Sequence, residues 1–275
     1  MPGSQPEMLT STKNPTIQRI RKWQRNARAR REANIFIAEG IRLLEEAQHA
    51  GWIPQTLLAV EDLPPRGAAL LDAWHASGVT PLWVAPHVMA AASDTQTPQG
   101  VLAVFPRRDY PLPVQPSFLL LLDGVRDPGN LGTILRTALA AGVEGILLPP
   151  GNADPYAPKV VRSAMGAHFH LPILPLAWDT LTERLHGLPI YLAEARRGIP
   201  YTQADFRTPC VLMVGGEASG PGTHGRELAT HTVHIPMPGP AESLNAAIAA
   251  ALLMFEVVRQ RNADDALSLS NPPTT

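Results

Sequence analysis

Residues 118–142 read FLLLLDGVRDPGNLGTILRTALAAG, and this stretch decides the fold of the second half of the chain. Residues 118–122 are an unbroken apolar run, which is typical of a strand covered on both faces. Apolar residues then recur at helical spacing, at Leu131, Ile134, Leu135, Ala138 and Leu139. The pattern stops at Gly142. The stretch therefore predicts a buried strand that leads through a polar turn into an amphipathic helix.

The same alternation continues toward the C-terminus. Strand-like runs follow at residues 145–148, 169–174, 189–193, 211–215 and 232–236. The last helical pattern places one set of apolar residues on a single face: Leu244, Ile248, Ala251, Leu252, Phe255 and Val258. Strands that alternate with helices predict an α/β fold with a parallel sheet and helices on both of its faces.

The first half of the chain predicts a smaller α/β domain. Short apolar runs at residues 55–60, 81–84 and 100–104 alternate with helical patterns. Four prolines within residues 106–116 favour an extended connector. We therefore expect a loose arm over 1–13, one domain over 14–105, a linker over 106–116, a second domain over 117–261 and a polar tail over 262–275.

Composition excludes several classes of protein. The chain has 275 residues with 45% hydrophobic residues, which is enough for a full core, and a single cysteine excludes a disulfide framework or a cysteine-based zinc cluster. Its histidines form no HExxH pattern, so we expect no metal site. Residues 1–14 contain no apolar run of signal-peptide length, and the longest apolar stretch, residues 246–255, is too short to span a membrane. The sequence therefore predicts a cytoplasmic protein without a membrane partner.

Charge is balanced overall but strongly uneven along the chain. There are 23 Lys and Arg residues against 24 Asp and Glu residues. Between Lys13 and Arg31, however, eight basic residues occur without a single acidic one. A solvated helix face normally mixes both signs of charge, so this segment indicates a surface for an anionic partner.

Three strand ends lead into polar, glycine-containing turns, where open parallel sheets bind ligands. In the first turn, Asn130 is expected to cap the helix, and Arg136 lies off the apolar stripe with Gly132 one turn below it. The alternative is a capped helix with a solvated arginine. The turn alone does not decide between them.

The second turn, GGEASG at residues 215–220, lets backbone amides approach a ligand closely. It matches neither GxGxxG nor GxxxxGK[ST], and the acid at Glu217 would repel a pyrophosphate. A neutral or cationic ligand fits better, although a plain tight turn is the alternative. The third turn, residues 235–245, places Ser243 and Asn245 where helix caps are common.

Together the three turns resemble one family. NLGTILR (130–136), GGEASG (215–220) and IPMPGPAESLN (235–245) are similar, in order and spacing, to the three motifs of SpoU/TrmH-type RNA ribose 2′-O-methyltransferases of the SPOUT superfamily. Position 216 departs from the family, which often has Asn or Ser where this chain has Gly. Residues 14–15, 38–42 and 97–101 also resemble the family's RNA-binding substrate domain.

The resemblance implies a deep trefoil knot, a homodimer formed through the knotted domain, and S-adenosyl-L-methionine as methyl donor. The donor would be held by Gly215, Gly216, Gly220, Ile235, Met237 and Leu244. The catalytic residues would be Arg136, Asn130, Glu217, Ser243 and Asn245. The family's usual assignment makes the first-motif arginine the base. Because a guanidinium keeps its proton in proteins, we expect Arg136 instead to orient the ribose and stabilise the developing alkoxide.

The resemblance also gives the basic segment a partner, RNA phosphate. The expected RNA-binding residues are Arg19, Arg21, Lys22, Arg25, Arg28, Arg30, Arg31 and Arg162. Because a separate N-terminal RNA module precedes the methyltransferase domain, we expect 23S ribosomal RNA as the substrate. Transfer RNA and a non-catalytic RNA-binding paralogue stay open as alternatives.

Overall fold

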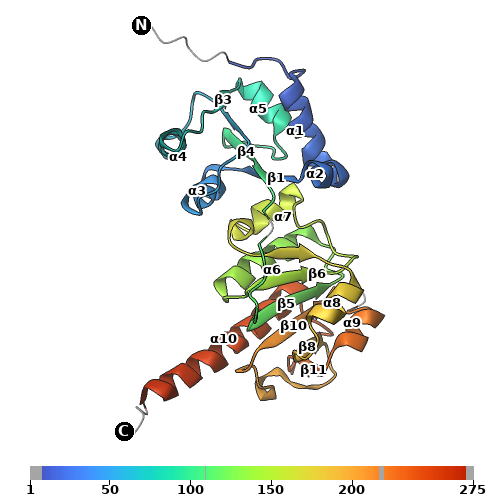
Figure 1. Cartoon of the computed structure of the whole chain (residues 1–275). Helices are drawn as coiled ribbons and strands as arrows, with labels where there is room; N and C mark the ends of the chain where they lie inside the picture. The colour runs from blue at the N-terminus through green and yellow to red at the C-terminus, as the bar shows by residue number, and fades with distance from the viewer. Residues whose placement is uncertain (1–7, 109, 217–219, 271–275) are drawn as a thin grey trace. The chain divides into compact units, whose positions relative to one another are not determined.

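The computed structural model describes residues 8–108, 110–216 and 220–270, with side chains as far as residue 263. The chain forms two compact units (Figure 1). The first combines residues up to 108 with Asp154–His170, and the second combines Tyr110–Ala153 with the residues from Leu171 onward. Among the described helices, none is long and apolar enough to cross a membrane.

The first unit is built on a mixed four-stranded sheet in the order β1-β4-β2-β3. Its strands are β1 (Ile35–Glu39), β2 (Thr56–Ala59), β3 (Leu82–Trp83) and β4 (Val101–Pro106). β4 is antiparallel to both β1 and β2, whereas β3 is parallel to β2. Helices pack around this sheet: α1 (Pro15–Arg25), α2 (Ala27–Ala33), α3 (Ile41–His49), α4 (Pro65–Ala76) and α5 (Pro86–Ala92).

Segment Asp154–His170 belongs to the first unit, which the expectation of one continuous domain over 117–261 did not anticipate. It contains α7 (Pro158–Ser163) and the short helix η1 (Ala167–Phe169). Phe169 packs against Phe36 and Trp52, and its carbonyl accepts a 3.0 Å hydrogen bond from the Trp52 indole. His168 is fully buried beside Phe36, and desolvation lowers its pKa to about 4. Aromatic burial therefore holds this segment.

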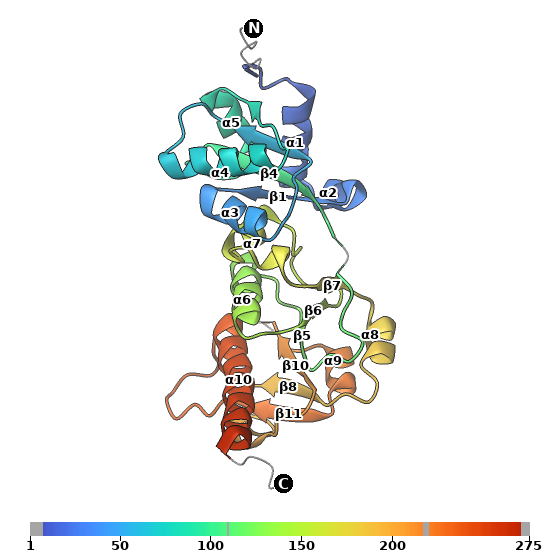
Figure 2. The same ribbon diagram turned by 60° about the vertical axis from the view of Figure 1, so that its left-hand side comes forward.

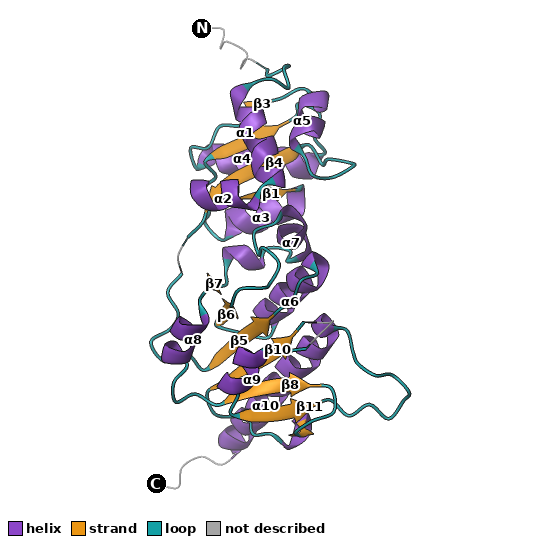
Figure 3. Cartoon of the chain, turned by 90° about the vertical axis from the view of Figure 1, so that its right-hand side faces the viewer, coloured by secondary structure: helices purple, strands orange, loops and turns teal. Residues whose placement is uncertain are grey.

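The second unit contains a seven-stranded parallel sheet in the order β7-β6-β5-β10-β8-β11-β9. Its strands are β5 (Phe118–Asp123), β6 (Gly145–Leu148), β7 (Ile173–Pro175), β8 (Ile190–Glu194), β9 (Ile199–Pro200), β10 (Cys210–Gly215) and β11 (His231–His234). Figure 2 shows α6 (Pro128–Ala140) and α10 (Ala246–Ser270) on one face, and α8 (Trp178–Arg184) and α9 (Thr223–Leu228) on the other. The parallel α/β fold expected from the sequence is confirmed (Figure 3).

Two local expectations are wrong. Asn130 does not cap α6, because Asp127 precedes the helix and its carboxylate accepts a 2.7 Å hydrogen bond from the Asn130 amide. The last helix also does not bury the face expected from its apolar pattern. Its buried face consists of differently spaced residues, namely Ala247, Ala250, Leu253, Met254 and Val257. Ile248, Leu252 and Phe255 are exposed.

Candidate active site

The carboxyl ends of three neighbouring strands form one edge of the parallel sheet. β5 and β10 run parallel in register, so that Asp123 lies opposite Gly215 where both strands end. β8, which pairs with the other side of β10, ends at Glu194. This is the edge at which open α/β sheets bind their ligands.

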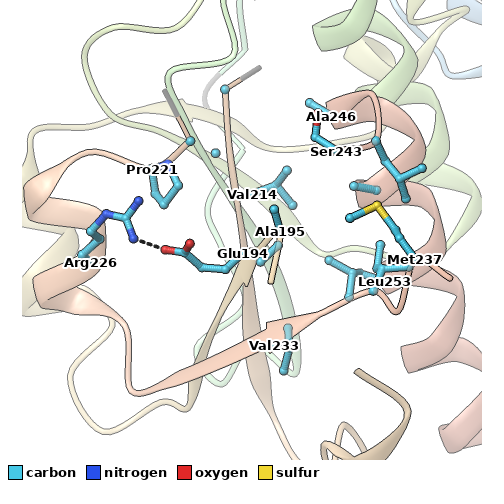
Figure 4. A pocket seen from close by; sticks show the side chains of 17 residues that line it. Glu194, Ala195, Val214, Pro221, Arg226, Val233, Met237, Ser243, Ala246 and Leu253 are labelled. Atoms are coloured by element: carbon cyan, nitrogen blue, oxygen red, sulfur yellow. Dashed lines mark hydrogen bonds and ion pairs between the residues drawn. The ribbon is translucent and has the colours of Figure 1, made fainter. Parts of the chain in front are cut away.

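A cavity of about 270 Å³ opens at this edge (Figure 4). All six residues expected to hold a cofactor line it: Gly215, Gly216, Gly220, Ile235, Met237 and Leu244. Ser243 lines it as well. The apolar part of the wall comes from Val214, Val233, Ala246, Ala249 and Leu253. The structure thus brings the second and third sequence motifs together around one partly apolar cavity.

Only glycine fits sterically at the first two positions of the second motif. A Cβ atom on Gly215 would overlap the backbone nitrogen of Pro221, and one on Gly216 would overlap the carbonyl oxygen of Gly124. The backbone therefore passes closer to its neighbours than any other residue would permit. This explains locally why position 216 is Gly in this chain.

Asp123 fixes the far end of the glycine-rich loop. Its carboxylate is buried and accepts a 2.7 Å hydrogen bond from the Gly222 amide, while its backbone carbonyl accepts one of 2.9 Å from the Gly216 amide. A Cβ on Gly225 would lie 2.6 Å from the same carboxylate. Sequence analysis missed Asp123, although an acid that ends a buried apolar strand was an available signal.

Glu194 and Arg226 form an ion pair in the cavity wall (Figure 4). Glu194 comes from the end of β8 and Arg226 from α9, which follows the glycine-rich loop. The pair places both signs of charge beside the apolar wall. Sequence analysis missed both residues, because their contact spans 32 positions and no short motif contains them.

The first and third motifs meet through two asparagines. The Asn245 side-chain amide donates a 3.0 Å hydrogen bond to the side-chain Oδ1 of Asn130. The side-chain Oδ1 of Asn245 in turn accepts from the backbone amides of Ala247 and Ile248, so that it also caps α10. Asn245 therefore caps α10 and also contacts the first motif, while its catalytic role stays a prediction.

The other two candidate catalytic residues, Arg136 and Glu217, are not seen at the cavity. Arg136 is exposed on α6, off its buried stripe, and is not among the residues that line the cavity. Glu217 lies outside the described residues. In the described ranges, no group of three or more His, Cys, Asp or Glu residues is arranged to hold a metal ion.

The predicted RNA-binding role of Arg30 is wrong. Arg30 is only 3% exposed, and its guanidinium donates to Asp154 at 2.6 Å and to the carbonyl oxygens of Trp23 and Gln24. It joins α2 to segment Asp154–His170 and cannot reach a phosphate. Arg28 and Arg162 are ion-paired with Glu32 and Asp94 but stay accessible. The other basic candidates are exposed, except for half-buried Arg21: Arg19, Lys22, Arg25 and Arg31.

We expect Arg30→Met to lower the free energy of unfolding by about 1–3 kcal/mol, because the partly buried Asp154 carboxylate and the carbonyl oxygens of Trp23 and Gln24 then lose their buried donor. Chemical denaturation measures this effect. Arg25→Ala, which removes an exposed guanidinium one helix earlier, should change stability by less than about 0.5 kcal/mol. Equal effects of the two substitutions would contradict a structural role for Arg30.

The chain is similar to known proteins over most of its length. Residues 117–255 match the model of the SpoU rRNA Methylase family, and residues 14–103 match an MRM3-like substrate binding domain. A 23S rRNA (guanosine(2553)-2′-O)-methyltransferase of Bacillus subtilis is 33% identical over 91% of this chain and 99% of its own length. A 23S rRNA (uridine(2479)-2′-O)-methyltransferase of Streptomyces viridochromogenes is 34% identical over 88% of this chain and 90% of its own.

Solved structures give the same result. The AdoMet-bound rRNA methyltransferase of Sinorhizobium meliloti matches with a TM-score of 0.81 and 33% identity, over 92% of this chain and 97% of that one. The SpoU methyltransferase AviRb of Streptomyces viridochromogenes, also solved with AdoMet, matches with a TM-score of 0.80 and 31% identity, over 91% and 99%. The family model that matches residues 117–255 and these relatives over nearly the whole chain show that the chain belongs to the SpoU rRNA methylase family.

Proposed function

We propose that this protein transfers the methyl group of S-adenosyl-L-methionine to a ribose 2′-hydroxyl of 23S ribosomal RNA. The observation that carries the proposal is the cavity at the strand ends, where all six expected donor-binding residues meet. Relatives over nearly the whole chain are named 23S rRNA 2′-O-methyltransferases, and two structural relatives were solved with this donor. The proposal includes a cytoplasmic location, where the protein would meet ribosomal RNA.

The cavity suits the donor chemically. Val214, Val233 and Leu253 offer an apolar wall for a flat ring, and the bare backbone at Gly215 and Gly216 permits close hydrogen bonding. Glu194 and Arg226 present both signs of charge to a ligand that carries an amino acid group. Main-chain groups at Gly215, Ile235 and Leu244 would hold the donor.

Bound S-adenosyl-L-methionine would supply an electrophilic methyl group: a ribose oxygen would take it as the methyl–sulfur bond breaks, S-adenosylhomocysteine would leave, and the hydroxyl proton would pass to water. The task of the protein is to position that oxygen, and good orientation contributes roughly 7–11 kcal/mol in favourable cases. Arg136 orients the ribose and its phosphate and stabilises the developing alkoxide. Asn130 and Asn245 fix the first motif against the third, and Ser243 completes the site.

Calorimetry with S-adenosylhomocysteine, followed by mapping of 2′-O-methyl groups in RNA from cells with and without the gene, tests the proposal. A 23S site that disappears with the gene supports it. Loss of a transfer RNA site instead would identify the substrate as transfer RNA. Absence of any binding heat would indicate a non-catalytic RNA-binding paralogue.

The trefoil knot implied by the family belongs to the same proposal, as does the homodimer. An unpartnered apolar stripe on α10 supports the dimer: Ile248 is 52% exposed, Leu252 41% and Phe255 48%. Exposed apolar stripes of this kind commonly mark interfaces. The proposed occupant of the stripe is a second copy of this chain.

We expect Leu252→Glu to convert the dimer into a monomer. Each subunit would then bury a carboxylate against the apolar stripe of the other subunit, and burial of an unpaired charge is unfavourable. Light scattering after size-exclusion chromatography measures the mass. The matched control is Glu227→Gln, which changes an exposed charge on α9 and should leave the mass unchanged. A wild-type protein that is already monomeric at micromolar concentration would contradict the dimer.

A further inference from the structure

Asn152 lies in the turn that follows β6, at the sheet edge that also carries the cavity proposed for the methyl donor. β6 is the neighbour of β5 on the side away from β10. The proposed methyl transfer draws on the turns after β5 and β10, but not on this one. The half-buried Asn152 side chain nevertheless makes three hydrogen bonds there, each to a backbone group.

These bonds join the turn after β6 to the end of β5 and the turn behind it. The Oδ1 atom of Asn152 accepts a 2.8 Å hydrogen bond from the Val125 amide. Its Nδ2 atom donates to the carbonyl oxygen of Leu122 at 2.7 Å and to that of Pro149 at 2.8 Å. The Ala153 amide adds a backbone bond of 2.9 Å to the Val125 carbonyl. The turn after β5 is therefore held from the β6 side.

The same turn contacts the glycine-rich loop on its other side. The carbonyl of Asp123, where β5 ends, accepts a 2.9 Å hydrogen bond from the Gly216 amide. A Cβ atom on Gly216 would overlap the Gly124 carbonyl oxygen, so the two backbones pass in close contact. Gly216 in turn lines the cavity. The turn after β5 therefore lies between Asn152 and the cavity wall.

Gly124 makes this turn dependent on its neighbours. Its φ is 81°, in the left-handed region that favours glycine. Because glycine has no Cβ, its own backbone conformation is weakly restrained, and hydrogen bonds around it must fix where its carbonyl points. Asn152 supplies such bonds on both sides, at Leu122 before Gly124 and at Val125 after it.

We propose that Asn152 is a positioning residue for the methyl donor. It is not among the residues that line the cavity, so it acts through the turn after β5 and not by contact with the ligand. The turn fixes the Gly124 carbonyl, and that carbonyl with its neighbour at Asp123 fixes the backbone at Gly216. The inference rests on the proposed function, because it takes S-adenosyl-L-methionine as the ligand of the cavity.

Calorimetry with S-adenosylhomocysteine tests the inference. We expect Asn152→Ala to weaken binding on the order of threefold to tenfold, which is the size of one net hydrogen bond. Asn152→Ser has a shorter side chain that can replace at most one of the three bonds, so its affinity should fall between those of Asn152→Ala and the wild type. It carries the test if Asn152→Ala does not fold. Wild-type affinity in the folded variants would overturn the proposal.

Glu144→Ala is the matched control, because Glu144 joins the same two strands at their amino ends. Its carboxylate accepts hydrogen bonds from the Ser117 amide at 2.7 Å and from the Ser117 hydroxyl at 2.9 Å. Ser117 directly precedes β5 and Glu144 directly precedes β6. The control should lower the unfolding midpoint and leave the affinity for S-adenosylhomocysteine unchanged. An equal loss of affinity in the control would assign the effect to general loosening of the sheet and overturn the proposal.

A double variant gives a readout that a purely structural role would not change. In Gly216→Ala the added methyl group overlaps the Gly124 carbonyl, which Asn152 holds in place through the turn. A turn released by Asn152→Ala can yield to that methyl group. The loss of affinity in the double variant should therefore be smaller than the product of the two single losses. Losses that multiply independently would contradict the link through the turn.

Hydrogen exchange of backbone amides separates this inference from the proposed function, since it needs no ligand. The Gly216 amide should exchange faster in Asn152→Ala than in the wild type, and at the wild-type rate in Glu144→Ala. If the wild type binds no S-adenosylhomocysteine while exchange changes as expected, the donor proposal is wrong and the action of Asn152 on the loop stands. If the wild type binds it and Asn152→Ala alters neither exchange nor affinity, the inference is wrong and the proposed function stands.

Discussion

Arg136→Lys is expected to reduce the rate of methyl transfer on saturating RNA by about 10²–10³-fold. A guanidinium can hold two oxygens at once through its planar fork, whereas an ammonium is a single point of charge. Loss of one preorganised donor to a developing oxyanion typically has an effect of this size. Because Arg136 is exposed on α6 and is not among the residues that line the donor cavity, affinity for S-adenosylhomocysteine should stay unchanged.

Single-turnover transfer of a radiolabelled methyl group measures the rate, and calorimetry measures the affinity. Arg184→Lys on α8 is the matched control, since it makes the same change at an exposed arginine outside the proposed sites. Near-normal turnover of the Arg136→Lys enzyme would contradict the proposal that the guanidinium holds two oxygens at once. A parallel loss of S-adenosylhomocysteine affinity would place Arg136 in the donor cavity instead.

Gly216→Ala is expected to weaken S-adenosylhomocysteine binding by about tenfold to a hundredfold. The added methyl group would meet the backbone carbonyl of Gly124, which cannot move aside as a flexible side chain can. The glycine-rich loop must therefore shift, and with it the backbone that lines the cavity. Overpacking of this kind also lowers the free energy of unfolding by about 1–3 kcal/mol.

Calorimetry and chemical denaturation measure the two effects on the same samples. Gly239→Ala is the control for stability, because nothing lies within 4 Å of a Cβ atom at that position. It should leave the unfolding midpoint close to that of the wild type. Normal stability and normal affinity in Gly216→Ala would show that the loop tolerates a side chain and that close backbone approach is not needed there.

Local sequence signals predicted much of the second unit. The apolar run at 118–122 became β5, and the glycine-rich turn after the run at 211–215 became a wall of the cavity. These predictions succeed because burial on both sides of a parallel strand leaves an unbroken apolar run in the sequence. The parallel arrangement then placed the polar turns at one edge of the sheet, because parallel strands end at the same edge.

Side-chain partners far apart in sequence could not be predicted in this way. Arg30 looked like one of eight equivalent cations, but its partner Asp154 lies 124 positions away. The single apolar face expected for the last helix contains Ile248, Leu252 and Phe255, which the structure leaves exposed. Glu194 and Arg226 became visible as site residues only through the ion pair between their separate elements.

The sequence by itself determined the alternation of strands and helices, the glycines at the strand ends and the three motifs of the methyltransferase family. Each of these depends on residues near one another in the chain, where spacing and backbone conformation act directly. Only the tertiary structure decided which arginines are free for RNA, which face of α10 is bare and that segment Asp154–His170 belongs to the first unit. Burial and ion pairing depend on neighbours in space, and folding brings those neighbours from anywhere in the chain.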